Sequence, residues 1–288
     1  MKVGEREKGV FFIITSAFFF ALMGIFVKLS GDLPTMQKSF FRNFVSLIVA
    51  IIMILRSGTK IHYTKEQIPV IILRAFFGTA GILCNYYCLD HMIASDATML
   101  NKLSPFFAII FSFLFLKEKT KIYQFAAVAI AFLGSLFIIK PTFTGMSFVP
   151  SLLGVIGGLS AGVAYTAVRK LGQIKTPGML VVFFFSAFSC LTTLPFVIAQ
   201  FKPMSLKQVL FLTLTGICAA TAQFSITAAY FHAPAREISV FDYSQVVFSA
   251  VLGFLICHEI PDVYSFAGYA VIICTAIFIF IKGKHVKI

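Results

Sequence analysis

The sequence predicts an all-α integral membrane protein in which ten transmembrane helices form two inverted five-helix repeats. Three observations support this fold class. Hydrophobic residues make up 59% of the 288 residues and the mean hydropathy is +0.95, well above the range of soluble domains. Ten apolar runs fill almost the whole chain. The last five of these runs resemble the first five at a constant offset along the sequence.

Each apolar run is close to the 20 or so residues that a helix needs to cross a hydrocarbon core of about 30 Å. Runs such as 10–27 are apolar on every side, which excludes the period-two alternation of a membrane β-barrel. The first run follows a charged segment but is too long for a signal peptide, so we interpret it as an uncleaved first helix. The connections are too short to fold as soluble domains. The expected spans are 9–29, 36–56, 67–89, 95–116, 121–140, 149–169, 178–200, 208–230, 236–257 and 263–282.

The internal repeat sets the domain organisation. Between 94–140 and 235–281, 11 of 47 aligned pairs are identical without a gap, where composition alone gives about 4. A unit with an odd number of spans must enter the membrane from the opposite side when it is repeated. This inverted arrangement is used by many transporters to alternate access. The sequence therefore predicts one repeat over 1–141 and a second over 142–288.

The net charge of +13 reports topology rather than a nucleic-acid partner. With the N-terminus inside, 16 of the 24 basic residues fall in cytoplasmic segments and five in external ones. This asymmetry predicts a multi-pass protein of the cell (inner) membrane with both termini in the cytoplasm. The cytoplasmic set is Lys2, Arg6, Lys8, Arg56, Lys60, Lys65, Lys117, Lys119, Lys121, Arg169, Lys170, Lys175, Arg236, Lys282, Lys284 and Lys287; the external set is Lys28, Lys38, Lys140, Lys202 and Lys207.

Small and soft residues have an ordinary structural interpretation. The sixth span is dense in glycine, serine and alanine between positions 154 and 164, as is the third at 78–81, and such runs allow helices to approach closely. All six cysteines fall in spans or at their ends, and no Cys/His set has zinc spacing. We therefore expect no metal site and no cofactor.

Four ionisable residues lie deep in spans, where a charge must face a cavity or a partner: Arg42, Arg74, Lys102 and Asp242. Counting about 1.5 Å per residue puts Arg74 and Asp242 each about 10 Å above the inner surface. We therefore expect these two residues to form an ion pair across the repeats. Arg42 and Arg74 are assigned to an ion pair or to gating, with a purely structural role left open for both.

The repeat locates the candidate substrate site. Asn101 aligns with Asp242, and Lys102 aligns with Tyr243, so both repeats place polar groups about two turns into their fourth helix. An inverted two-fold axis would bring these helices together near the midplane. Helix–helix hydrogen bonds remain an alternative role for the neutral polar groups. The predicted substrate-binding set is Asn85, Tyr86, Asn101, Lys102, Tyr165, Gln223, Asp242, Tyr243 and Gln245.

Five segments carry a resemblance to a known family: 41–43, 73–78, 103–118, 242–253 and 258–262. Together they resemble the drug/metabolite transporter superfamily, in its ten-helix EamA-type branch, over the whole chain. The later segments are similar to bacterial branches that move S-adenosylmethionine, riboflavin or other metabolites. The resemblance implies a central cavity lined mainly by spans 1, 3, 4, 6, 8 and 9. Arg42 lies on span 2, outside that set.

We therefore predict a secondary transporter, and not an enzyme, that moves a small organic metabolite by alternating access. Three deep bases against one acid favour an anionic or zwitterionic substrate, such as S-adenosylmethionine, riboflavin or an amino-acid-like compound. The expected partners are this metabolite and the lipid bilayer, with a homodimer left open. The alternative is an intramembrane enzyme acting on lipid or a small hydrophobic substrate. The histidines disfavour it because all five lie at span ends or in loops.

Overall fold

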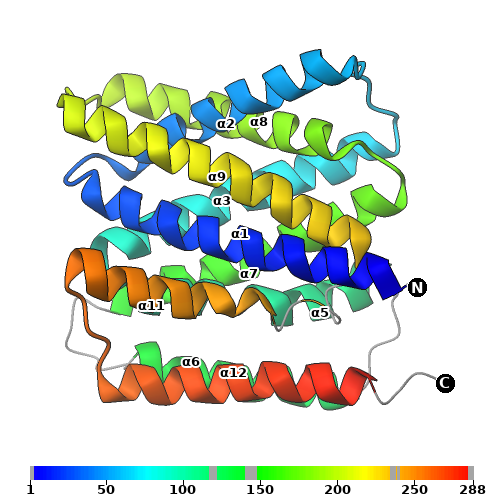
Figure 1. Ribbon diagram of the computed structural model, residues 1–288, viewed down its shortest axis with the longest axis vertical. Coiled ribbons are helices and arrows are strands. Elements are labelled where there is room, and N and C mark those ends of the chain that lie inside the picture. The colour runs from blue at the N-terminus through cyan, green and yellow to red at the C-terminus, as the bar shows by residue number, and fades with distance from the viewer. Residues whose placement is uncertain (1–2, 117–121, 140–147, 234–237, 239–240, 285–288) are drawn as a thin grey trace.

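The computed structural model describes residues 3–116, 122–139, 148–233, 238 and 241–284. These residues form an all-α fold, and Figure 1 shows the long helices running side by side. The helices are α1 Val3–Leu29, α2 Thr35–Ser57, α3 Gln67–His91, α4 Ala94–Asn101, α5 Ser104–Leu116, α6 Ile122–Ile139, α7 Phe148–Gln173, α8 Gly178–Ala199, α9 Leu206–His232, α11 Ser244–Cys257 and α12 Val263–Lys284.

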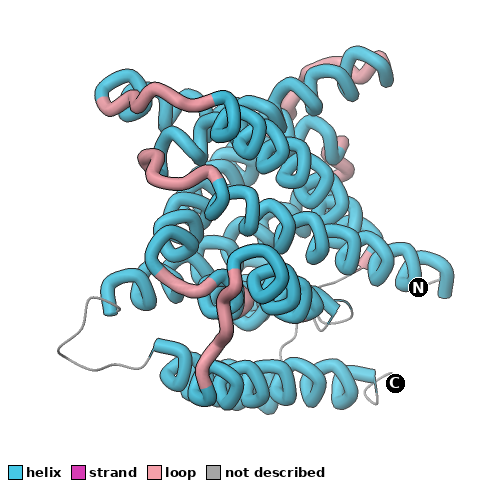
Figure 2. Tube along the Cα trace, turned by 60° about the vertical axis from the view of Figure 1, so that its left-hand side comes forward, coloured by secondary structure: helices cyan, strands magenta, loops and turns pink. Residues whose placement is uncertain are grey.

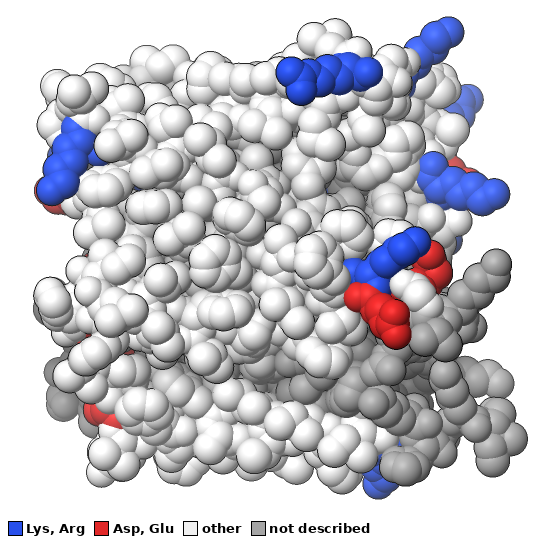
Figure 3. Space-filling view, viewed as in Figure 1, with Lys and Arg blue, Asp and Glu red and all other residues white. Residues whose placement is uncertain are grey.

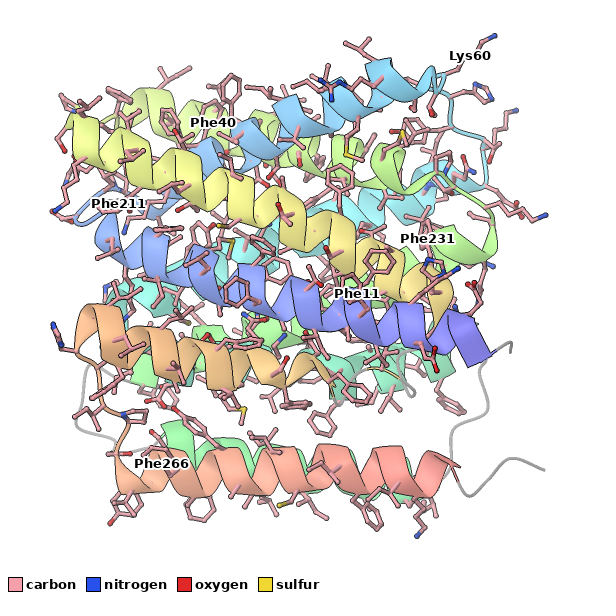
Figure 4. All side chains as sticks on the ribbon, viewed as in Figure 1. Phe11, Phe40, Lys60, Phe211, Phe231 and Phe266 are labelled. Atoms are coloured by element: carbon pink, nitrogen blue, oxygen red, sulfur yellow. The ribbon has the colours of Figure 1, made fainter. Side chains whose placement is uncertain are left out.

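The protein is an integral membrane protein. Within the described part of the chain, seven stretches are long and apolar enough to cross a bilayer, and α11 and part of α12 are shorter apolar helices. Figure 3 shows a largely uncharged surface across the middle of the molecule, with charged side chains towards the two ends of the helices. Figure 4 shows the same division at the level of single residues. Phe11 and Phe211 lie along the helices, and Lys60 lies in the connection that follows α2.

The two repeats are inverted with respect to each other. Lys28, near the end of α1, donates from Nζ to the carbonyl of Met92 at 2.6 Å, so α1 and α3 end on the same side. His232 closes α9, the helix equivalent to α3, and its Nδ1 lies 2.6 Å from Glu5 Oε2 at the start of α1. The equivalent helices α3 and α9 therefore end at opposite surfaces.

Helix packing follows the same two-fold relation. The pair α1–α9 has its counterpart in α3–α7, and α5–α7 has its counterpart in α11–α1. The equivalent helices α2 and α8 pack against each other, and so do α6 and α12. Figures 1 and 2 show α12 along one edge of the molecule, and α2 and α8 lie at the opposite edge in Figure 1. The inner helices of both repeats lie between these layers and enclose the centre.

The fourth span of each repeat is broken, where the sequence predicts continuous spans over 95–116 and 236–257. In the first repeat, a turn at Lys102 and Leu103 separates α4 from α5. Pro105 accounts for this turn because it has no N–H to continue the helix ladder. In the second repeat, a turn at Tyr243 precedes α11. Lys102 and Tyr243 are equivalent positions, so both helices break at the same point of the repeat.

Glycines on α7 allow this helix to pack closely against the broken one. A Cβ at Gly158 would lie 2.8 Å from the Leu100 carbonyl oxygen, and a Cβ at Gly154 would lie 2.7 Å from Leu100 Cδ1. A Cβ at Gly162 would lie 3.0 Å from the Ser104 carbonyl oxygen on the other side of the break. The predicted packing role of the small residues in this span thus agrees with close contact along α4 and α5.

Candidate functional site

The centre of the molecule holds a narrow cavity between the two repeats. Its volume is about 70 Å³, enough for several water molecules. Helices α1, α2, α3, α4, α7, α8, α9 and α11 all contribute to its wall. The lining residues are Phe20, Met23, Arg42, Arg74, Gly78, Gly81, Ile82, Asn85, Tyr86, Asn101, Ala161, Ala164, Tyr165, Phe185, Gln223 and Gln245.

Two arginines place positive charge in this cavity. Arg42 on α2 and Arg74 on α3 are only 1% and 2% exposed. Their guanidinium carbons lie 5.6 Å and 3.9 Å from the centroid of the same ring, that of Phe185 on α8. Aromatic faces attract cations electrostatically, and the attraction is stronger where water is excluded. Phe185 therefore provides both guanidinium groups with a favourable but uncharged contact.

Neither guanidinium has a carboxylate partner among the described residues. Arg42 Nη1 donates to the neutral amide oxygen of Asn43 at 2.5 Å, and Arg42 Nε has no partner. Arg74 Nε likewise has none. The described residues that line the cavity include no aspartate, glutamate, histidine or cysteine. The cavity thus has a net positive charge that its own wall does not neutralise.

Neutral polar groups complete the wall. Asn85 and Tyr86 come from α3, Asn101 comes from the end of α4, and Gln245 lies in the first turn of α11. Gln223 on α9 is buried, and its Nε2 has no hydrogen-bond partner among the residues that the structure describes. Buried polar groups are usually paired, so an unpaired amide facing a cavity is a candidate ligand contact.

The second pair of charged residues lies outside the cavity wall. Lys102 Nζ lies 2.6 Å from Asp242 Oδ2, and both side chains are buried. The Tyr243 hydroxyl donates to the Lys102 carbonyl at 2.9 Å. That carbonyl is available because the amide of Phe106 instead bonds to Leu103, within the turn that separates α4 from α5. The breaks in the two repeats are therefore tied to each other by a charged and a neutral hydrogen bond.

The predicted ion pair between Arg74 and Asp242 is wrong, because Asp242 pairs with Lys102 and Arg74 lies over Phe185. The depth count assumed straight, unbroken spans. The breaks at Lys102 and Tyr243 are at equivalent positions of the two repeats. Inverted repeats bring such positions together near their two-fold axis. The repeat alignment therefore located Asp242 better than the distance from the membrane surface did.

Comparison with known proteins identifies the family. The model of the EamA-like transporter family matches the chain twice, over residues 7–140 and 149–281. This chain belongs to the EamA-like transporter family. The two matches divide the chain close to the predicted repeat boundary at residue 141.

Relatives of this EamA-like protein are named as transporters. It is 28% identical to the pseudopaline exporter CntI of Pseudomonas aeruginosa, covering 94% of this chain and 95% of that protein. It is 25% identical to a riboflavin transporter of Vibrio cholerae, covering 94% and 92%. It is 26% identical to mouse solute carrier family 35 member G1, covering 90% and 74%. A solved crystal structure has the same fold, with a TM-score of 0.73 at 16% identity and 98% of this chain covered.

The structure places the predicted site residues in two groups. Eight of them line the cavity of this EamA-like protein: Arg42, Arg74, Asn85, Tyr86, Asn101, Tyr165, Gln223 and Gln245. The other three, Lys102, Asp242 and Tyr243, form the bonds between the helix breaks and do not line it. Tyr165 also stacks on Tyr230, with ring centroids 5.3 Å apart.

Two features of the cavity differ from what the resemblance implied. Arg42 lines the cavity although it lies on the second span, and Phe185 does so from the seventh. Phe185 was not predicted because it lies in a run of three phenylalanines, 183–185, that looks like a lipid-facing surface. In the structure, its burial and its contacts with the two guanidinium groups distinguish it from Phe183 and Phe184.

Proposed function

We propose that this protein is a secondary transporter that moves a small anionic or zwitterionic organic metabolite across the cell (inner) membrane by alternating access. The observation that carries the proposal is the pair of buried arginines, Arg42 and Arg74, facing a central cavity without a neutralising carboxylate among the described lining residues. An unpaired charge in a membrane protein is costly, so its retention favours a ligand that supplies the counter-charge. Transport by the named relatives supports the same class of function.

Each lining group has a proposed role. Arg42 and Arg74 bind the acidic part of the substrate through charge-assisted hydrogen bonds, which are stronger than neutral ones. Gln223, Asn101 and Gln245 contact its neutral polar groups, together with Asn85, Tyr86 and Tyr165. Phe20 and Met23 offer apolar surface to the remainder of the molecule. We favour a transporter over the alternative, an intramembrane enzyme, because the relatives are named as transporters or solute carriers.

Alternating access would require the contacts at the two ends of the bundle to part in turn. At one end, Lys28 pairs with Glu259, and Lys38 Nζ lies 2.5 Å from Asp90 Oδ1. At the other end, Glu5 meets His232. Both sets join helices that border the cavity, and each is more exposed than the Lys102–Asp242 pair. We propose that these contacts close the two entrances, while the bonds between the helix breaks stay intact.

A ligand screen tests the proposal. The purified protein is screened by thermal shift against metabolites that include S-adenosylmethionine, riboflavin and amino acids, and hits are then assayed for transport in proteoliposomes. Arg42→Gln and Arg74→Gln should each weaken binding of the hit by about 10-fold to 150-fold, because a hydrogen bond to a charged group contributes about 1.5–3 kcal/mol. Lys202→Gln is the matched control, since Lys202 is half exposed and pairs with Asp32, and neither residue lines the cavity. Unchanged transport in both arginine variants would refute the proposal.

The proposed orientation has its own test. Sixteen basic residues on one side against five on the other support the proposal that both termini lie in the cytoplasm. A periplasm-active reporter should be silent when fused after Lys60 or Lys284 and active when fused after Lys140. Activity after Lys284 would contradict an even number of spans.

A further inference from the structure

Arg42 and Arg74 come from different helices but share one aromatic platform. Their guanidinium carbons lie 5.6 Å and 3.9 Å from the Phe185 ring centroid, so two positively charged groups contact the same ring. Like charges repel strongly where water is scarce. A cavity wall that holds two such groups together, with both side chains at least 98% buried, needs other contacts that fix them in place.

Gly78 fixes the position of Arg74. It lies one helical turn after Arg74 on α3, and a Cβ at this position would overlap Arg74 Nη1 and lie 2.8 Å from Phe185 Cε2. The arginine side chain therefore occupies the space that any other residue at position 78 would fill with its own side chain. Because Gly78 has no Cβ, the Arg74 guanidinium can pack along its own helix in the cavity wall.

Asn43 fixes the position of Arg42 in a corresponding way. Its side-chain oxygen accepts from Arg42 Nη1 at 2.5 Å, and its side-chain nitrogen donates to the Ser39 carbonyl at 2.9 Å, one turn earlier on α2. Asn43 is fully buried. This contact orients the guanidinium group but leaves its charge in place, because an amide is neutral. Both arginines are thus positioned by uncharged groups and keep their full charge for a ligand.

We propose that Arg42 and Arg74, held on Phe185, form a paired receptor that selects substrates carrying two acidic groups. This inference rests on the proposed function and narrows its substrate class to dianions such as dicarboxylates or compounds with a carboxylate and a phosphate. A substrate with one acid group would neutralise one arginine and leave the other buried and unpaired. A simple zwitterion would bring an ammonium group into a wall that has no carboxylate among its described residues.

The absence of tryptophan from the whole chain gives a direct assay. Phe185→Trp introduces the chain's single tryptophan at the platform itself, where it can be excited selectively over the nine tyrosines, and keeps an aromatic face for the two guanidinium groups. The purified variant is titrated with three probes of four carbons each: succinate, butyrate and 1,4-diaminobutane. Succinate should give a saturable change in emission, butyrate should bind at least about 10-fold more weakly, and the diamine should give none. Thermal shift of the wild-type protein with the same probes checks that the new tryptophan does not create the site.

Matched glycine variants test the positioning. In the Phe185→Trp background, Gly78→Ala should weaken succinate binding at least about 10-fold, because the added methyl group displaces Arg74. Gly24→Ala is the control, since a Cβ there would meet only Leu89 at the ordinary distance of 3.6 Å and Gly24 does not line the cavity. Arg74→Gln provides a second route to the same loss if Gly78→Ala reduces the yield of folded protein.

The outcomes separate this inference from the proposed function. Absence of a response to succinate, or equal affinity for succinate and butyrate, overturns the selection of two acidic groups. If butyrate binds and Arg74→Gln abolishes its binding, an anion transporter remains and only the pairing fails. If the diamine binds and the two acids do not, both the inference and the anionic substrate of the proposed function fail.

Discussion

The cavity and the joint between the two helix breaks, formed by Lys102, Asp242 and Tyr243, both bury basic side chains. The charge is paired in the joint and unpaired in the cavity. Lys102 is 2% exposed and has Asp242 at 2.6 Å, whereas Arg42 and Arg74 are equally buried and have no carboxylate among the described residues. A buried charge that is paired contributes to holding two segments together. A buried charge that is unpaired and faces a cavity is available to a ligand. The difference therefore separates residues that join the repeats from residues that we propose bind the substrate.

The largest expected effect follows from breaking the joint. Asp242→Asn leaves Lys102 buried without a counter-ion, which should cost about 3–5 kcal/mol of stability. The double variant Lys102→Met with Asp242→Leu removes both charges and should recover most of that loss, because a buried pair can be replaced by apolar residues. Apparent unfolding temperatures in detergent measure both effects. A double variant no more stable than Asp242→Asn alone would show that the two residues are not coupled.

A smaller effect is expected from the neutral bond of the same joint. Tyr243→Phe removes the hydroxyl that donates to the Lys102 carbonyl and leaves that carbonyl buried, at a cost of about 1–3 kcal/mol. The same measurement of unfolding temperature applies. Ligand binding in the cavity should persist in the fraction of protein that is folded, because Tyr243 does not line the cavity. If Tyr243→Phe abolishes binding without loss of stability, Tyr243 belongs to the substrate site after all.

The smallest effect is a pH dependence at the surface of α1. The hydrogen bonds of Glu5 with His232 and with Lys8 lower the pKa of Glu5 below its ordinary value of 4.5. A lowered pKa means that the stabilisation is complete above the unfolded value and is lost as the pH falls through the folded one. Wild-type protein should therefore be slightly more stable than Glu5→Gln at neutral pH, and this difference should vanish in acid. A difference that persists at low pH would contradict the assignment.

Much of this fold was predictable from the sequence. Apolar runs of membrane length predicted the long helices, and the offset between residues such as Tyr123 and Tyr264 predicted the repeat. These features depend on hydrophobic composition and on the spacing of the repeat, both of which can be read directly from the sequence. The breaks at Lys102 and Tyr243 were not predicted. Pro105 on its own is compatible with a kink as well as with a full interruption, and the second repeat has Val246 at the equivalent position.

The site was predictable only in part. Asn101 and Gln245 were predicted from the repeat alignment, and both line the cavity. The prediction of Arg74 as the partner of Asp242 was wrong, because the pairing depends on how broken helices bring side chains together. The role of Phe185 depends on which face of α8 points inwards, and a run of three phenylalanines carries no such signal.

One matched pair of substitutions tests the central claim most directly: Arg74→Gln and Lys102→Gln, each compared with wild type by thermal unfolding without ligand. Both remove a deeply buried cation and replace it with the same neutral side chain. Lys102→Gln should lose about 3–5 kcal/mol, because Asp242 is then left unpaired. Arg74→Gln should be at least as stable as wild type, because the lost contact with Phe185 is offset by relief of an uncompensated charge. Equal destabilisation by the two substitutions would contradict the claim that Arg74 has no counter-ion in the protein and is available to bind an anionic ligand.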